Sequence, residues 1–190
     1  RIEEGEGRQN RLGKREHDLE EDLEGIKELG CNIIRVADFA WDIIEPEDGK
    51  YDFSLFDRVV ERAAAHGLKV MMCTPTATMP AWLYYAHPDI MIEDEHGNRQ
   101  PFGARRGYCM NNDYYVQKAS AVSRAMARHY KDNETVVIWQ TDNEAGHEGS
   151  DMCWCDNCRR KFVSWLKGRY ASIDELNERW VSSFLSHMYS

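Results

Sequence analysis

The chain has 190 residues, of which 42% are hydrophobic and 30% are charged, and its formal net charge is −9. This length and composition are ordinary for one soluble globular domain with a sizeable core. The acidic balance argues against a nucleic-acid partner, which basic patches would favour, and the sequence has no run of the ~18 apolar residues that a membrane helix needs. Because the polar start also lacks a hydrophobic signal segment, we expect a cytoplasmic protein without a membrane partner.

Hydrophobic periodicity predicts alternating helices and strands. In chain order, it predicts a helix over 18–29, a strand over 32–37, a helix over 54–66, a strand over 68–73, a helix over 113–130, a strand over 135–140 and a helix over 159–170. Ser54 is the expected N-cap of the second helix, and Gly30 and Gly67 are stop signals after the first and second helices. Ser172 and Glu175 form a capping-box signature that predicts one more helix.

The connection over 74–112 is far longer than the usual loop of about 2–6 residues between a strand and a helix. Its many aromatic residues and prolines favour an ordered, functional loop. The strands are nearly continuous apolar runs that alternate with helices, which indicates parallel strands covered by helices. A doubly wound sheet and a TIM barrel both fit this pattern. No glycine-rich phosphate-binding motif follows a strand, so the nucleotide-binding folds lose support.

Polar residues gather where the predicted strands end, among them Asp38, Thr74 and Glu144. A (β/α)8 TIM barrel places its active site at these carboxyl ends, and this pattern favours the barrel. A complete barrel needs about 200–250 residues or more, whereas only three clear strands are predicted and none precedes the first helix. We therefore expect about the first half of a TIM barrel, with a poorly ordered start at residues 1–14.

An apolar strand runs into the pair Asn143 and Glu144, and this pair is the candidate for catalysis. Glu144 at the rim of a barrel could act as a general acid, although a solvated loop carboxylate is the alternative reading. Asn143 could contact a ligand hydroxyl group or could simply close the strand in an Asx-turn. Arg105 and Arg106 could each donate a forked contact to a ligand, and the residues alone do not distinguish them.

Three cysteines lie close together at Cys153, Cys155 and Cys158, and Cys109 is available upstream as a fourth. A tetrahedral zinc site needs four ligands, so Cys109 would complete it only if the long loop folds beside the later one. A zinc site, free thiols and disulfides are all open at this point. The tight spacing, in a chain large enough to need no disulfide, suits a metal best.

Several short motifs together resemble those of the glycoside hydrolase family 42 β-galactosidases. They are Phe39-Ala-Trp41, Glu45-Pro46, Thr74-Pro-Thr-Ala-Thr-Met-Pro-Ala-Trp-Leu83, Arg105-Arg-Gly-Tyr-Cys109, Asp142-Asn-Glu144 and the cysteine cluster at Cys153. The resemblance runs from about Leu19 to Phe184. It implies a retaining enzyme on a (β/α)8 barrel that removes terminal β-D-galactosyl residues from β-galactosides, is often trimeric and carries structural zinc. Residues 1–190 would then be the amino-terminal portion of the catalytic barrel.

The resemblance also implies roles for single residues. Glu144 would be the general acid/base, while Asn143 and Arg105 would contact the sugar. The zinc ligands would be the four residues Cys109, Cys153, Cys155 and Cys158.

Three departures from the family pattern qualify this assignment. The nucleophilic glutamate belongs to the seventh strand and would lie beyond residue 190, the first strand has no recognisable counterpart, and Phe184-Leu185-Ser186 replaces the usual Phe-Trp-Ser. We expect the 190-residue chain alone to be inactive, because retention needs two carboxyl groups. A zinc-stapled barrel fragment without activity, or another barrel glycosidase of the same clan, are the competing hypotheses.

Overall fold

A computed structural model of the chain describes residues 18–103, 105–144, 146 and 152–182. The predicted poorly ordered start at 1–14 and the Phe184-Leu185-Ser186 departure lie outside these residues. Within them, one sheet of three parallel strands has the order β1-β2-β3, with β1 at Ile33–Val36, β2 at Lys69–Cys73 and β3 at Val136–Gln140. All three predicted strands and their parallel pairing are confirmed.

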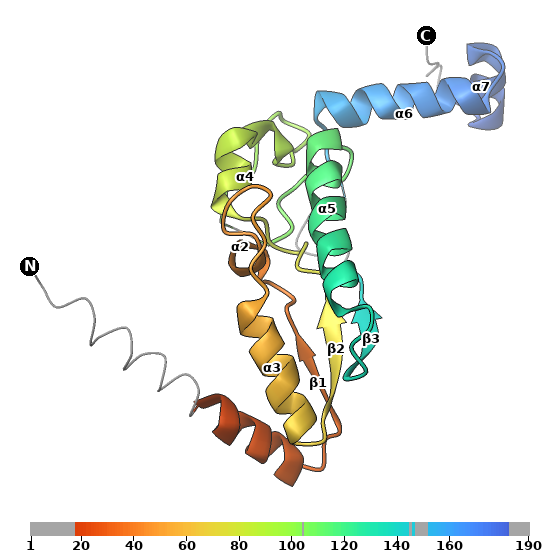
Figure 1. The fold of residues 1–190 in the computed structure, drawn as a ribbon. Coiled ribbons are helices and arrows are strands. Elements are labelled where there is room, and N and C mark those ends of the chain that lie inside the picture. Colours follow the sequence, from red (N-terminus) through yellow and green to blue (C-terminus); the bar gives the residue numbers. More distant parts are fainter. Residues whose placement is uncertain (1–17, 104, 145, 147–151, 183–190) are drawn as a thin grey trace, which may run out of the picture.

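Helices cover one face of this sheet (Figure 1). In the core, Val70 and Met72 of β2 pack against side chains from three helical segments. These segments are residues 18–28, α3 at Ser54–Ala65 and α5 at Asp113–Tyr130. The opposite face is lined by Arg35, Lys69 and Met71, since successive side chains of a strand point to opposite sides. Helices outside and a separate inner face are the arrangement predicted for part of a barrel.

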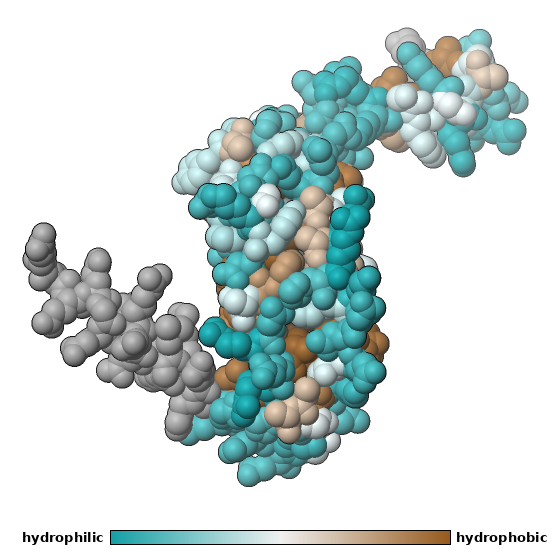
Figure 2. All heavy atoms as spheres, in the orientation of Figure 1, coloured by the Kyte–Doolittle hydropathy of each residue, from teal (hydrophilic) through white to brown (hydrophobic). Residues whose placement is uncertain are grey.

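Both outer strands of the sheet have an open edge among the described residues. Val137 and Ile138 of β3 are 49% and 45% exposed despite their apolar side chains. Hydrophobic atoms accordingly reach the surface over β3 (Figure 2). An apolar strand that is half exposed is suited to pairing and packing with a further strand, as in a continuing barrel.

The expected N-cap of α3 is wrong. Phe53 occupies the N-cap position and makes no side-chain cap, while Ser54 is the first helical residue. The carboxylate of Asp52 accepts the Ser54 N–H at 2.9 Å, so the helix start is capped from one residue further upstream. Gly30 and Gly67 follow their helices with φ of 80° and 69°, as their stop signals predicted, because this left-handed backbone favours glycine.

The described residues of the long connection are ordered, as predicted, and contain two short helices that periodicity did not indicate. These are α4 at Ala81–Ala86 and the 3-10 helix η1 at Pro88–Ile90. A further short helix, α2 at Trp41–Ile44, follows β1 and was also not predicted. Elements of four to six residues are too short to leave a periodic pattern in the sequence.

The last two described helices, α6 at Asp156–Arg169 and α7 at Ile173–Arg179, project from the body at the end where α4 lies (Figure 1). The capping box of α7 is confirmed, since the Ser172 hydroxyl accepts from Glu175 N–H at 3.1 Å. No residue of α6 is buried. In the part of the chain that the structure describes, no helix is long and apolar enough to cross a membrane.

Candidate functional site

The turn that follows β3 carries Asp142, Asn143 and Glu144, and it lies beside the end of β2. The Thr74 hydroxyl, directly after β2, accepts the Asp142 N–H at 2.7 Å. Parallel strands bring their carboxyl ends to one edge of a sheet, and this hydrogen bond joins the two ends. The candidate catalytic pair is therefore at the edge of the sheet where a barrel has its active site.

Glu144 faces a guanidinium from the long loop. Arg105 Nη2 lies 3.1 Å from Glu144 Oε2, and the two side chains are 34% and 46% exposed. Both groups are thus accessible from solvent while they contact each other. A sugar entering here would meet a carboxyl group that can exchange a proton and a guanidinium that can donate to hydroxyl groups.

Asn143 is tied to its own turn through several contacts. Its N–H donates to Asp142 Oδ1 at 2.9 Å, and its Oδ1 accepts from Gln140 Nε2 at 3.3 Å. In the first contact the side chain belongs to Asp142, and in the second the Asn143 side chain bonds to the side chain of Gln140, so neither is an Asx-turn made by Asn143. The two contacts use the N–H and the Oδ1 of Asn143, so they do not prevent its side-chain amide nitrogen from donating to a hydroxyl group.

Arg106, the neighbour of Arg105, lies in a different environment. Its side chain is only 4% exposed and contacts both oxygens of Asp142, at 3.1 and 3.2 Å. The residue types alone do not separate the two arginines, whereas the tertiary structure directs Arg105 to Glu144 and Arg106 to Asp142. The sequence reasoning named both Arg106 and Asp142 but did not predict that they pair with each other.

Arg35 is a functional candidate that the sequence reasoning missed. It belongs to the apolar strand β1, forms an ion pair with Asp38 at 2.7 Å and donates to Gln140 Oε1 at 3.3 Å. A charged residue within a strand whose neighbours are apolar was the signal that could have identified it, because such strands normally bury both faces. Arg35 connects the end of β1 with the end of β3 across the inner face of the sheet.

The four cysteines converge, as the predicted metal site requires. The Sγ atoms of Cys109, Cys153, Cys155 and Cys158 all lie within 4.8 Å of one another. Cys109 Sγ is 3.7 Å from Cys155 Sγ and 3.4 Å from Cys158 Sγ. Zinc–sulfur bonds of ~2.3 Å in a tetrahedron would separate the sulfurs by about 3.8 Å, so the cluster has the size of a four-thiolate site.

The long loop reaches the cluster through backbone pairing. Within the long loop, Cys109 N–H donates to Ile90 O at 2.7 Å. Trp154 N–H donates to Glu93 O at 2.8 Å, and this second bond joins the long loop to the segment that carries the other three cysteines. All six cysteines are free thiols, and the separations above exclude a disulfide, whose sulfurs are about 2.05 Å apart. Of the alternatives that the sequence left open, a metal site or free thiols remain.

The protonation of the cluster depends on burial and on mutual hydrogen bonds. Burial raises the pKa of Cys109 strongly and that of Cys153 as well, so both remain neutral thiols at neutral pH without a cation. Burial also opposes ionisation of Cys155, but hydrogen bonds from the Cys158 backbone and the neighbouring thiols outweigh it and lower the pKa of Cys155. Cys155 is the N-cap of α6, where the helix dipole also favours an anion.

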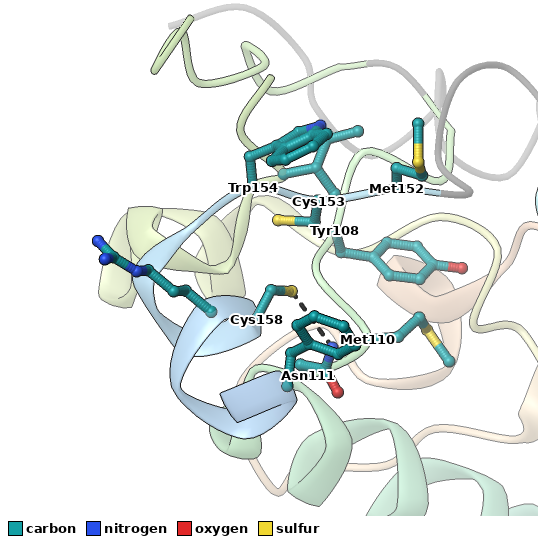
Figure 3. Close-up of a pocket in the computed structure, with 10 residues that line it drawn as sticks. Tyr108, Met110, Asn111, Met152, Cys153, Trp154 and Cys158 are labelled. Carbon is teal, nitrogen blue, oxygen red and sulfur yellow. Dashed lines mark hydrogen bonds between the residues drawn. The ribbon is translucent and has the colours of Figure 1, made fainter. Parts of the chain in front are cut away.

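A cavity of about 630 Å³ adjoins the cysteine cluster (Figure 3). It is lined by Met110, Met152, Trp154 and other side chains, and Asn111 Nδ2 donates to Cys158 Sγ at 3.2 Å within it. Neither Glu144 nor Arg105 is among the lining residues. The cavity therefore belongs to the surroundings of the cysteines and not to the candidate catalytic turn.

The sequence model of a glycoside hydrolase family, Glyco_hydro_42, described as beta-galactosidase, matches residues 13–190. Similar curated proteins include the beta-galactosidase Bga of Halorubrum lacusprofundi, 39% identical over 170 residues, and the beta-galactosidase BgaA of a Thermus species, 40% identical over 169 residues. These alignments cover 90% and 89% of this chain but only 24% and 26% of the relatives. The chain thus spans about a quarter of their length.

Solved structures agree with the sequence comparisons. The structure of the polyextremophilic beta-galactosidase from Halorubrum lacusprofundi matches with a TM-score of 0.86 and 38% identity, over 92% of this chain and 26% of that one. A GH42 beta-galactosidase, Gan42B, matches with a TM-score of 0.86 and 34% identity, over 94% of this chain and 26% of that one. The predicted fold, parallel strands and outer helices of a partial TIM barrel, is confirmed.

Proposed function

Because the chain belongs to glycoside hydrolase family 42, the beta-galactosidases, we propose that it supplies the acid/base side of the active site of a retaining β-galactosidase. The observation that carries this proposal is the contact between Arg105 and Glu144 at the carboxyl edge of the sheet, 3.1 Å apart and open to solvent. Residues 1–190 are the amino-terminal portion of the barrel domain in this proposal. The substrate is a β-galactoside.

In the proposed reaction, Glu144 protonates the glycosidic oxygen as the bond to the anomeric carbon breaks, and later takes a proton from the attacking water. Asn143 contacts the 2-hydroxyl of the galactosyl group, a hydrogen bond that strengthens as positive charge develops on the ring. Arg105 orients the sugar through forked donation to its hydroxyl groups. Each of these roles rests on the family resemblance together with the position of the residue in the turn or in the facing loop.

Retention needs a second carboxylate about 5–5.5 Å from the first, as the nucleophile. Among the described residues, Asp142 lies in the same turn as Glu144 and is held by both nitrogens of Arg106, so it is not placed across a sugar from Glu144. Glu148 and Asp151, which flank the same turn in sequence, lie outside the described residues. We place the nucleophile beyond residue 190 and expect no turnover by these 190 residues alone.

The four-cysteine cluster is proposed to hold structural zinc. The sulfur separations fit tetrahedral coordination, and the Asn111 contact to Cys158 provides an outer hydrogen bond of the kind that orients metal ligands. When bound, the metal would supply a cross-link and no chemistry at the sugar. It would fasten the loop that carries Arg105 to the segment that follows Glu144.

Zinc binding by the cluster is expected to strengthen as pH rises. Cys109 and Cys153 have raised pKa values and must lose protons to become ligands, so binding releases protons and lower pH favours the metal-free thiols. Competition titrations with a chromophoric chelator at pH 6, 7 and 8 measure this dependence. An affinity that is constant across the series would contradict thiolate ligation.

The test of the proposed function uses the full-length gene product, meaning the complete open reading frame that contains these residues. Proton NMR of its reaction with a nitrophenyl β-galactoside is expected to show β-galactose as the first product, since retention keeps the anomeric configuration. The 190-residue chain, assayed in parallel, is expected to show no turnover. α-Galactose as the first product, or turnover by the shorter chain, would contradict the proposal.

A further inference from the structure

The contact between Arg106 and Asp142 is the most buried ion pair near the candidate catalytic turn. Both guanidinium nitrogens reach the carboxylate, at 3.1 and 3.2 Å, and the two side chains are 4% and 21% exposed. Such a paired, charge-assisted contact is directional and stronger than a neutral hydrogen bond. Arg106 also donates to the backbone carbonyl of Asn143, so one side chain holds two successive residues of the turn.

The backbone of the same residues is in an unfavourable conformation. Arg106, Asp142 and Glu144 have φ of 60°, 57° and 50°, in the left-handed region. For residues other than glycine this conformation is unfavourable, because the side-chain Cβ crowds the backbone. The turn therefore needs contacts that hold it, and the Arg106–Asp142 pair joins two of the three residues concerned.

Further contacts show that Asp142 is the fixed point of the turn. Its N–H donates to the Thr74 hydroxyl at 2.7 Å, its carbonyl accepts from Gln140 Nε2 at 3.0 Å, and its carboxylate accepts from Asn143 N–H at 2.9 Å. Glu144 is two residues further along. Its own side chain is half exposed and touches Arg105, so its orientation depends on the backbone that Asp142 fixes.

We propose that the Arg106–Asp142 ion pair positions Glu144 for proton transfer to the leaving group. The inference rests on the proposed function, in which Glu144 is the acid/base. Arg106 and Asp142 do not touch the substrate in this proposal; they act through the turn and are positioning residues. Arg105 binds the sugar, whereas Arg106, next to it in sequence, holds the turn through Asp142 and the Asn143 carbonyl.

The proton step defines a measurable consequence. The nucleophilic carboxylate attacks the anomeric carbon while the bond from that carbon to the glycosidic oxygen breaks, and the electron pair leaves with the oxygen. An alkoxide or sugar leaving group needs the proton of Glu144 to depart as an alcohol, whereas a dinitrophenolate departs as a stable anion. Misplaced acid therefore slows the reaction of poor leaving groups selectively.

The experiment measures kcat/KM of the full-length gene product on lactose and on dinitrophenyl β-galactoside. The variants are Asp142→Asn, Arg106→Lys and the neutral double variant Arg106→Gln/Asp142→Asn, which leaves no unpaired buried charge. Glu144→Gln reports on the acid itself. Arg99→Gln is the matched control, because Arg99 lies in the same long loop and its contacts are an ion pair with Glu93 at 2.9 Å and a hydrogen bond to the Met91 carbonyl, neither of which involves Asp142, Asn143 or Glu144.

We expect the double variant to lose about 10²-fold on lactose, the loss typical of a misplaced reacting group, and less than about 5-fold on the dinitrophenyl substrate. Arg106→Lys should recover part of this loss, because a single ammonium keeps the charge but not the forked contact. The Arg99→Gln control should lose equally little on both substrates.

The positioning role would be overturned if the pair variants lost kcat/KM equally on both substrates while Glu144→Gln lost more on lactose than on the dinitrophenyl substrate. That result would leave the proposed function intact. If Glu144→Gln itself lost kcat/KM equally on both substrates, the proposed function would fail and the inference with it. If all the pair variants failed to give folded protein by circular dichroism, the pair would be a folding requirement and the positioning role would be rejected.

Discussion

Replacing Glu144 by glutamine in the full-length gene product is expected to lower kcat/KM for lactose by roughly 10²–10⁴-fold, the usual contribution of general acid–base catalysis. Glutamine keeps the size of the side chain and can still accept a hydrogen bond from Arg105, so the site should stay intact. It cannot deliver a proton to the glycosidic oxygen. Steady-state kinetics on lactose and on an activated aryl β-galactoside measure the effect, and the aryl substrate should lose much less.

Glu134→Gln is the control for this experiment. Glu134 is an exposed glutamate that precedes β3, whereas Glu144 follows it, so the same chemical change is made at the opposite end of one strand. Its activity should match that of the unchanged protein. Glu144→Gln retaining more than half of the lactose activity would show that Glu144 is a solvated loop acid, the reading that the sequence left open.

Removing Cys109, one of the proposed metal ligands, is expected to release the α6–α7 segment from the body. The core beneath this segment is small, consisting of Ile92, Cys109 and Cys155 with two partly buried cysteines packed against them, and α6 itself has no buried residue. Structural zinc in small domains contributes about 10–16 kcal/mol of apparent binding free energy, which is available for folding. Without it, little else in the described structure fastens residues 152–182.

The measurement is hydrogen exchange of the Cys109→Ser variant and of the unchanged chain treated with a chelator. Exchange should accelerate over residues 152–182 and 90–110, while the main core around Val70 and Met72 stays protected. The zinc content, measured by elemental analysis in the presence of a competing chelator, should fall from one zinc per unchanged chain to less than about a tenth in Cys109→Ser. Cys31→Ser, at an exposed cysteine outside the cluster, should keep both the zinc and the protection.

Full zinc occupancy in Cys109→Ser would exclude Cys109 as a ligand. A chain that never contains zinc but shows the same protection would indicate that free thiols and backbone pairing suffice. That outcome would reject the structural metal and would leave the catalytic proposal unchanged, because Glu144 and Arg105 contact each other directly.

Much of the fold could be predicted from the sequence because its elements have local causes. The strand over 135–140 and the helix over 113–130 agree with β3 and α5 within one residue, since long periodic or continuous apolar runs leave few alternatives. The first residue of α3 was predicted correctly, but its N-cap was wrong. Ser54 and Asp52 are both good capping residues, and the choice between them depends on the angle at which the chain enters the helix.

The sequence by itself determined the parallel αβ class, the candidate catalytic turn and the group Cys153, Cys155 and Cys158, because each depends on residue types at short spacing. The tertiary structure brought Cys109, which is distant in sequence, to the other three cysteines. Only the tertiary structure separated Arg105 from Arg106, which are chemically identical and adjacent. It did so because the long loop passes the turn after β3 in such a way that one guanidinium meets Glu144 and the other is buried against Asp142. The direction of a side chain in an irregular loop is decided by contacts with residues far away in sequence, and no local pattern records it.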